Sequence, residues 1–324
     1  MRYVFFGTPG FAAIILEKLI EAGMPPALVV CNPDKPAGRK KIITPPPVKK
    51  LLIEKFKDLK IGILQPESLK NFQFGEVRPP DINVNLGRPN LQKFDFCVVA
   101  AYGKIIPKSV LDTSPAKFIG VHPSLLPKYR GATPIQSAIL AGDEVTGVTL
   151  YLMDDQVDHG PILVQQELEI LNSNFETLNR KLAEMAGDLL VDFLNQFREV
   201  QSPHELQSIF GRLNLRPQND KEATYTKKFC DEDGFVDLEK DDIAAIERKI
   251  RALNPEPGVW TYAKTLRQFW EVRPPNIAVN LGRSNLHEYK RVKILEAEVV
   301  DGKLKLKKVQ FEGKKPQTIN GIVR

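Results

Sequence analysis

The sequence predicts an α/β protein in which a doubly wound, mostly parallel sheet is followed by a smaller domain built mainly of β-strands. Through about residue 200, short apolar runs alternate with segments of helical spacing, an order that implies parallel strands joined by helices. Beyond that point, alternating apolar and polar residues indicate strands with one buried face. The expected strands are 3–7, 27–31, 94–101, 292–300 and 303–311, and the expected helices are 11–22, 47–56 and 241–253.

The turn Gly7-Thr8-Pro9-Gly10 joins the first expected strand to the first helix, where nucleotide-binding loops occur in such folds. It has neither the GxGxxG spacing of dinucleotide sites nor the lysine of the Walker pattern. A bound dinucleotide is therefore not expected.

The composition, 42% hydrophobic and 27% charged over 324 residues, is typical of a chain that buries a core and argues against disorder. No apolar run approaches the ~18 residues of a membrane span, and the first residues do not resemble a secretion signal. We therefore expect a cytoplasmic protein without membrane contacts. Cys31, Cys97 and Cys230 are widely separated, so neither a metal site nor a disulfide framework is expected.

The charge is distributed unevenly along the chain. Residues 1–150 carry 20 basic against 12 acidic side chains, residues 151–250 carry 11 against 21, and residues 251–324 carry 15 against 7. Two basic segments around an acidic one suit a polyanion that is bound at two separate places, although scattered solvated lysines give the same counts.

The change of pattern near residue 200 divides the chain into domains. We expect a first domain at 1–202, a polar linker at 203–219 and a second domain at 220–324.

One internal repeat follows neither domain's pattern. Residues 76–91 and 271–286 match at 13 of 16 positions, whereas their surroundings do not match, so a tandem repeat and a duplicated domain are both excluded. We expect inserted peptides at 75–93 and 269–289 in exposed loops, where added length costs little. A duplicated arginine-bearing binding loop is the alternative.

The candidate site centres on His122, which follows a short apolar run and therefore lies near a strand end. A histidine at such a place can be structural or catalytic. A carboxylate beside the imidazole would fix its tautomer and favour its charged form, the usual arrangement for acid–base chemistry. The segments that carry these groups are 121–131 (VHPSLLPKYRG) and 157–161 (VDHGP).

Both segments resemble the folate-dependent formyltransferases, whose shared pattern is Asn-x-His-x-Ser-Leu-Leu-Pro followed by Asp-x-Gly-Pro. His122 and Asp158 stand at the histidine and aspartate positions. The loop 34–39 resembles the members that act on initiator tRNA rather than on sugars or ribonucleotides. The resemblance covers nearly the whole chain except the repeated segments, with further matches at 6–9, 32–39, 44–48, 64–66, 100–104, 147–149, 223–225 and 254–260.

The resemblance implies a Rossmann-like formyltransferase domain, an OB-like β-barrel at the C-terminus, and transfer of the formyl group of 10-formyltetrahydrofolate to the α-amine of methionyl initiator tRNA. His122 would stabilise or protonate the oxyanion of a tetrahedral intermediate, and Asp158 would keep His122 charged and help to move the amine proton. The folate pocket would be lined by Ser124, Leu125, Leu126 and Pro127. Folate is then a diffusible cosubstrate, and no tightly bound cofactor or metal is expected.

One position departs from the family pattern. Gly120 stands where the family has asparagine, and residues i and i+2 of a strand share one face, so an asparagine there would point beside His122. Loss of one oxyanion donor typically costs ~10²–10³ in turnover. The chain is then a slow enzyme, an enzyme helped by water or by another side chain such as His159, or a tRNA- or folate-binding homologue without turnover. A nucleotide-sugar formyltransferase is a further alternative, which the basic second domain disfavours.

Basic residues in both domains are the candidate contacts to tRNA. They are Lys35, Arg39, Lys40, Lys41, Arg291 and Lys293, followed by Lys303, Lys305, Lys307 and Lys308. A solvated strand face is the alternative for the last group. The expected partners are methionyl initiator tRNA and the folate cosubstrate, with the chain acting as a monomer.

Overall fold

The computed structural model describes residues 2–38, 40–70, 94–112, 117–198, 213–263, 266 and 291–322. They belong to two compact units, one made of Met1–Ala132, Val145–Glu169 and Asn179–Tyr225, the other of Thr133–Glu144, Ile170–Leu178 and Thr226–Arg324. The repeated segments 76–91 and 271–286, with the insertions expected around them, lie outside the described residues, and the domain boundaries at 202 and 219 stay predictions.

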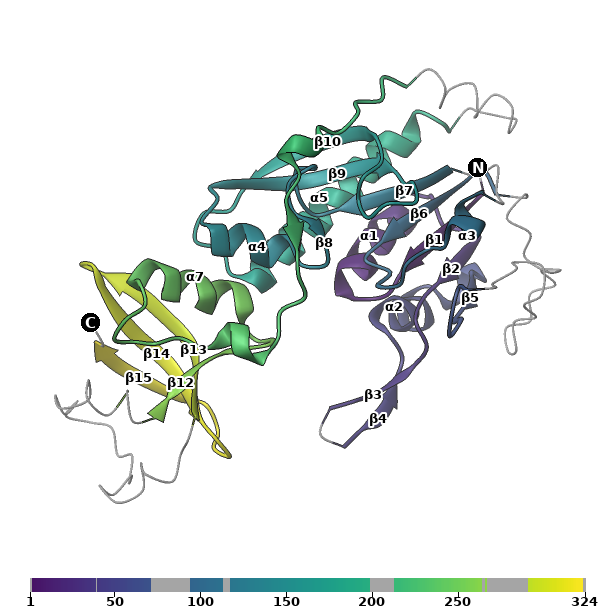
Figure 1. Cartoon of the computed structure of the whole chain (residues 1–324). Coiled ribbons are helices and arrows are strands. Elements are labelled where there is room, and N and C mark those ends of the chain that lie inside the picture. The colour runs from purple at the N-terminus through teal and green to yellow at the C-terminus, as the bar shows by residue number, and fades with distance from the viewer. Residues whose placement is uncertain are drawn as a thin grey trace. The chain divides into compact units, whose positions relative to one another are not determined.

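The first unit is built on a seven-stranded sheet in the order β10-β9-β7-β6-β1-β2-β5 (Figure 1). Strands β5, β2, β1, β6 and β7 run parallel, whereas β9 is antiparallel to both β7 and β10. This confirms the expected doubly wound, mostly parallel sheet. The strands are β1 (Tyr3–Gly7), β2 (Leu28–Val30), β5 (Gly62–Leu64), β6 (Phe96–Ala100), β7 (Lys117–His122), β9 (Val145–Leu152) and β10 (Ile162–Glu169).

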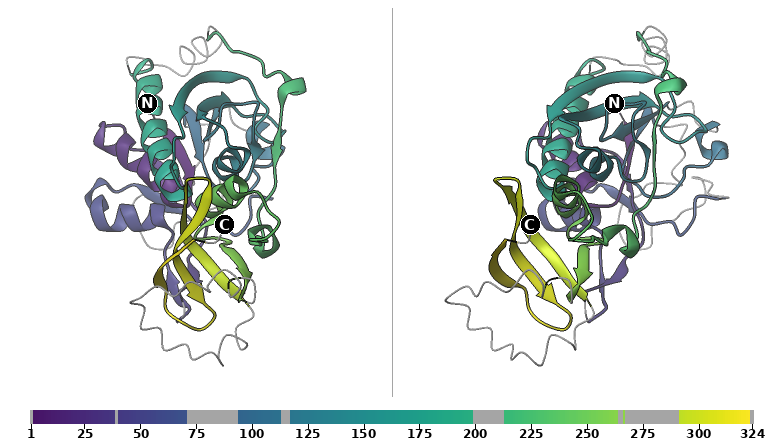
Figure 2. Two further views of the ribbon diagram at one scale, coloured as in Figure 1. Left: turned by 90° about the vertical axis from the view of Figure 1, so that its left-hand side faces the viewer. Right: turned by 60° about the vertical axis from the view of Figure 1, so that its left-hand side comes forward.

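Helices cover both faces of this sheet, as its two-sided apolar strands require. On one side lie α1 (Gly10–Glu21) and α5 (Phe175–Asn195), which Lys18 and Asp188 join at 2.5 Å; Figure 2 shows these purple and teal helices on the same side. A Cβ on Gly7 would lie 2.7 Å from that of Ala12, so glycine allows α1 to approach β1 closely. The other helices of this unit are α2 (Pro47–Lys55), α3 (Lys108–Asp112) and the short turns η1 (Lys57–Leu59) and η3 (Asp220–Glu222).

Aromatic and branched side chains form the core under the opposite face. Phe6 of β1 contacts Tyr102 edge-on with ring centroids 5.5 Å apart, and Phe118 of β7 lies 6.0 Å away. Val110 of α3 closes this core. The sheet is thus buried on both sides, which explains the valine-rich strands of the sequence.

Two small pairs of strands extend from the first unit. The hairpin of β3 (Lys35–Ala37) and β4 (Ile42–Thr44) projects away from the sheet between β2 and α2 (Figure 1). Ile42 and Ile43 in this hairpin are each 62% exposed. The second pair is β8 (Arg130–Gly131) with β11 (Tyr225–Thr226).

The second unit contains a four-stranded antiparallel sheet in the order β12-β13-β14-β15, so the expected β-rich C-terminal domain is confirmed. Asp242 caps α7 by accepting a hydrogen bond from the Ala245 amide at 2.9 Å, and Ile246 and Ile250 lie on the buried face of that helix. The elements are α4 (Pro134–Ala141), η4 (Asp231–Gly234), α7 (Ile243–Leu253), β12 (Val259–Tyr262), β13 (Arg291–Val300), β14 (Lys303–Phe311) and β15 (Gln317–Ile322).

The described residues contain no disulfide, no cluster of metal-ligating side chains and no membrane-spanning helix. All three cysteines are free, Cys31 and Cys97 are buried, and burial raises the pKa of the Cys31 thiol to about 12. Within these ranges no group of three or more His, Cys, Asp or Glu side chains is placed to hold a metal ion. None of the described helices is long and apolar enough to cross a membrane.

Candidate active site

His122 ends β7 at the carboxyl edge of the sheet and is only 5% exposed. Its Nε2 lies 2.9 Å from the carbonyl oxygen of Tyr129, and its Nδ1 lies 3.5 Å from Oδ2 of Asp158. Both ring nitrogens therefore face oxygen atoms that accept hydrogen bonds. The structure brings the predicted pair together.

Asp158 is fixed by donors to each of its carboxylate oxygens. Oδ2 accepts a hydrogen bond from the Gly131 amide at 2.8 Å, and Oδ1 accepts one from the Tyr151 hydroxyl at 2.6 Å. The backbone of Asp158 has φ of 50°, a left-handed conformation that an L-residue adopts at a cost. A carboxylate held in this way presents one orientation to His122.

Gly120 lies on the same face of β7 as His122 and is paired directly with Tyr151 of β9. An ideal Cβ on Gly120 would lie 2.3 Å from Cε1 of the Tyr151 ring, too close for any side chain. The ring of Tyr151 therefore fills the space beside Gly120, and its one hydroxyl proton is donated to Asp158 Oδ1, so the expectation that the site lacks an oxyanion donor stays a prediction. Sequence reasoning missed Tyr151, since only the pairing of β7 with β9 brings it there.

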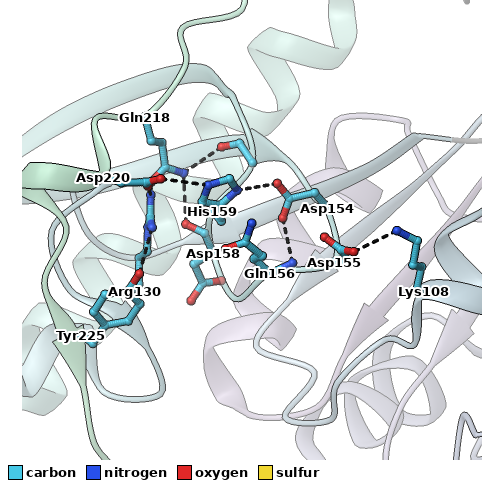
Figure 3. Close-up of polar contacts among 11 residues, drawn as sticks. Lys108, Arg130, Asp154, Asp155, Gln156, Asp158, His159, Gln218, Asp220 and Tyr225 are labelled. Atoms are coloured by element: carbon cyan, nitrogen blue, oxygen red, sulfur yellow. Dashed lines mark hydrogen bonds and ion pairs between the residues drawn. The ribbon is translucent and has the colours of Figure 1, made fainter.

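A buried guanidinium holds the backbone around this pair. Arg130 is 1% exposed and donates to Oε1 of Gln218 from Nε at 3.0 Å and from Nη2 at 2.7 Å. The amide of Gln218 in turn donates to the carbonyl oxygens of Asp158 at 3.0 Å and Gly160 at 2.8 Å (Figure 3). Arg130 also lies between Tyr129 and Gly131, the residues whose backbone contacts His122 and Asp158. This network positions both members of the pair.

His159 does not reach the site. Its Nδ1 lies 2.6 Å from Asp154 Oδ2 and its Nε2 lies 3.4 Å from Asp220 Oδ2, and Figure 3 shows the ring directed toward these two carboxylates. The hydrogen bond to Asp154 is the main cause that raises the pKa of His159, and burial opposes it. The idea that His159 replaces the missing asparagine is not supported, because its ring nitrogens face Asp154 and Asp220.

The expected folate-lining residues divide into two kinds. Ser124 and Leu126 are buried: the Ser124 hydroxyl donates to the Lys128 carbonyl at 2.6 Å, and Leu126 packs against Tyr151. Leu125 and Pro127 are partly exposed. Ser124 and Leu126 thus shape the loop, whereas Leu125 and Pro127 are the two that a ligand can touch.

The basic residues proposed for tRNA also differ from one another. Lys35, Lys40 and Lys41 are exposed on the β3–β4 hairpin, whereas Arg39 lies outside the described residues. In the second unit, Lys293 is exposed, and Arg291 lies 3.9 Å above the Trp260 ring and pairs with Asp231. Lys305 and Lys307 pair with Glu298, and Lys308 pairs with Glu296 at 3.1 Å. These last three lysines have acidic partners, which favours the solvated-face interpretation for them.

A histidine–carboxylate pair at the carboxyl edge of a doubly wound sheet is an arrangement suited to enzymatic acid–base chemistry. The model of the family described as "Formyl transferase" matches residues 1–194. The model described as "Formyl transferase, C-terminal domain" matches residues 228–324. The chain belongs to the formyltransferase family.

Within the formyltransferase family, this chain is similar to curated methionyl-tRNA formyltransferases. The methionyl-tRNA formyltransferase of Kosmotoga olearia is 35% identical over 98% of this chain and 94% of that protein, and that of Thermotoga maritima is 35% identical over 98% and 93%. The methionyl-tRNA formyltransferase of a Nitratiruptor species is 43% identical over 80% of this chain and 76% of that protein.

Solved structures share the fold at low identity. HypX from Aquifex aeolicus in complex with tetrahydrofolic acid is 16% identical, with a TM-score of 0.56 over 99% of this chain and 46% of that chain. A 4-N formyltransferase from Francisella tularensis is 17% identical, with a TM-score of 0.55 over 80% of this chain and 92% of that chain. A sugar N-formyltransferase from a Shewanella species is 15% identical, with a TM-score of 0.53 over 81% of this chain and 92% of that chain, and it shares the fold alone.

Proposed function

We propose that this chain transfers the formyl group of 10-formyltetrahydrofolate to the α-amine of methionyl initiator tRNA, a step of translation initiation in the cytoplasm. The observation that carries the proposal is the contact between His122 and Asp158 at the end of β7, in a chain whose near full-length relatives are methionyl-tRNA formyltransferases. Nucleotide-sugar acceptors are disfavoured, because the sugar N-formyltransferases are similar only at 15–17% identity, whereas the methionyl-tRNA formyltransferases are 35–43% identical.

The chemistry follows from the charges at the pair. The α-amine attacks the formyl carbon as the neutral base, a form that is accessible near neutral pH because such amines have a pKa of ~7.7–8. The new N–C bond forms, the C–N10 bond to the folate breaks, and the proton that the amine loses is delivered to the departing N10. His122 stabilises the oxyanion of the tetrahedral intermediate, and Asp158 balances the charge of the ring and moves the amine proton.

Folate is the cosubstrate of this reaction and leaves as tetrahydrofolate. Leu125 and Pro127, which are partly exposed, provide apolar contacts beside His122 in this proposal. The buried Ser124 and Leu126 stabilise the loop that carries them. The Ser124 hydroxyl donates to the Lys128 carbonyl, and Leu126 packs against the Tyr151 ring.

The tRNA is held by phosphate contacts in both units. The β3–β4 hairpin offers exposed Lys35, Lys40 and Lys41 together with the exposed apolar side chains of Ile42 and Ile43. Lysines bind phosphates and apolar tips contact bases, so the hairpin suits a nucleic acid end. In the second unit Lys293 is the corresponding exposed contact, and Arg291 would bind a phosphate in exchange for its half-exposed ion pair with Asp231.

A single-turnover assay tests the proposed function. With saturating 10-formyltetrahydrofolate and methionyl initiator tRNA, the wild-type chain should form formylmethionyl-tRNA, and His122→Ala and Asp158→Asn should each lose ~10²–10⁴ in rate. His159→Asn is the matched control, because His159 carries the same type of side chain beside Asp158 but contacts Asp154 and Asp220. Formylation of an amino sugar nucleotide in place of the tRNA, or tRNA binding without turnover, would contradict the proposal.

A further inference from the structure

The pairing of Gly120 with Tyr151 bears on how the site works without the expected asparagine. The two residues face each other in the antiparallel register of β7 and β9. Side chains of directly opposed residues lie on one face of the sheet, and His122, two residues further along β7, shares that face. Tyr151 therefore lies on the side of the sheet that carries the active-site pair.

The Tyr151 ring fills the space that a side chain at position 120 would need. An ideal Cβ there would lie 2.3 Å from Cε1, 2.4 Å from Cζ and 2.7 Å from Oη of the ring. The ring is 3% exposed and packs with Leu126 and Ile162, which limits its freedom to move aside. Because glycine has no Cβ, the Tyr151 ring can pack directly against the β7 backbone at position 120.

The hydroxyl of Tyr151 forms a hydrogen bond with the carboxylate of Asp158. It donates to Oδ1 at 2.6 Å, while the Gly131 amide donates to Oδ2 at 2.8 Å. Hydrogen bonds to a charged carboxylate are the short and strong kind. With one donor on each oxygen, the plane of the carboxylate is fixed, and Oδ2 is held 3.5 Å from Nδ1 of His122.

The phenol keeps its proton throughout the working range of the enzyme. Burial, followed by the negative charge of Asp158, raises the pKa of Tyr151 well above its ordinary value of 10.0. Tyr151 therefore acts as a donor to Asp158 at every pH at which the reaction is measured.

We propose that Tyr151 is a positioning residue of the transfer reaction: its hydroxyl takes the place left open at Gly120 and holds the Asp158 carboxylate beside His122. The inference rests on the proposed function of the His122–Asp158 pair. The phenol reaches position 120 from β9 and orients Asp158, because its one proton is donated to that carboxylate and is not available to the oxyanion.

Tyr151→Phe tests the proposal, since it removes one oxygen and leaves the ring. We expect kcat to fall ~10–100-fold, as for other residues that orient an active group, with KM for both substrates within about twofold. The kcat–pH profile should also differ from that of the wild type, because the Asp158 carboxylate beside His122 loses one of the two donors that fix it. Tyr3→Phe is the matched control: its buried hydroxyl donates to the Met24 carbonyl at 2.6 Å at the other end of the sheet, and kcat should not change. A Tyr151→Phe enzyme with wild-type kcat and pH profile overturns the proposal.

A swap of the two paired residues adds an independent test. Gly120→Asn alone should lower the melting temperature and the activity, because its Cβ collides with the ring. Tyr151→Ala removes the ring and the hydroxyl. The double variant Gly120→Asn, Tyr151→Ala should have a kcat at least tenfold higher than that of Tyr151→Ala alone. A Gly120→Asn chain as stable and active as wild type, or a double variant no better than Tyr151→Ala, contradicts the proposal that the Tyr151 ring takes the space of a side chain at position 120.

One measurement needs no substrate and separates this inference from the proposed function. In protein labelled with ¹⁵N-histidine, the ring signals of His122, identified by their loss in His122→Gln, should shift and change their pH dependence in Tyr151→Phe, whereas those of His159 should not. Unchanged His122 signals refute the role of Tyr151 even if the chain formylates tRNA. Changed signals in a chain that formylates no tRNA support Tyr151 and refute the proposed acceptor.

Discussion

Arg130 links the two backbone segments that hold the active-site pair, so its replacement should affect both stability and turnover. Through Gln218 it reaches the carbonyl oxygens of Asp158 and Gly160, and its own neighbours in sequence contact His122 and Asp158. Arg130→Met keeps most of the side-chain volume and removes the guanidinium. The oxygen of Gln218, which accepts two of its hydrogen bonds, then loses both.

The size of the effect follows from which partners are buried. A hydrogen bond to a charged group contributes ~1.5–3 kcal/mol, and the two bonds to Gln218 share one acceptor and count once. Asp220 and Tyr225, the other partners of Arg130, are 62% and 71% exposed, so water replaces the guanidinium there and they add little. The free energy of unfolding should therefore fall by ~1.5–3 kcal/mol, which lowers the melting temperature by ~3–12 °C.

Calorimetry and single-turnover kinetics measure the two consequences. The rate should fall ~10–100-fold, because a small displacement of Asp158 or of the Tyr129 carbonyl misaligns the pair. Lys108→Met is the control, since it removes a side chain of the same charge from an exposed ion pair with Asp155 (Figure 3) and should change neither quantity. An Arg130→Met chain that melts with the wild type and keeps its rate would show that the network does not hold the site.

The other two predictions concern charge. The pKa of His159 is raised above its ordinary 6.5, so its pairing with Asp154 stabilises the fold fully below about pH 6.5, and this contribution is lost as pH rises through the raised pKa. His159→Asn should therefore lower the melting temperature more at about pH 6 than at about pH 9. An equal loss at both pH values would argue against a stabilising charged pair. Replacing Lys35, Lys40 and Lys41 by alanine should weaken tRNA binding and reduce its salt slope by ~0.7–0.9 per lost contact, whereas Lys305→Ala with Lys307→Ala should not, since both pair with Glu298. Filter-binding titrations at several salt concentrations measure this, and an unchanged slope for the first set would remove the hairpin from the interface.

Much of the fold was predictable from local pattern. The apolar runs 3–7 and 94–101 contain β1 and β6, and the periodic segment 241–253 contains α7, whose first turn Asp242 caps. These features depend on residues close in sequence, whose spacing reports which face is buried. The position of His122 at a strand end was predictable for the same reason.

Contacts between distant segments were not predictable in this way. Ser124 and Leu126 match the family motif, yet both side chains are buried beneath the loop. Lys305 and Lys307 alternate as a basic face should, but Glu298 on the neighbouring strand pairs with both. In each case the deciding partner comes from packing or from a strand register that no local pattern encodes.

By itself the sequence determined the class of fold, the family and the pair His122 and Asp158, because these depend on periodicity and on a motif contiguous in the chain. Only the tertiary structure decided what stands at the place of the missing asparagine. Gly120 and Tyr151 are opposed because β9 turns back antiparallel to β7, and that register places a phenol where the sequence shows only the absence of a side chain.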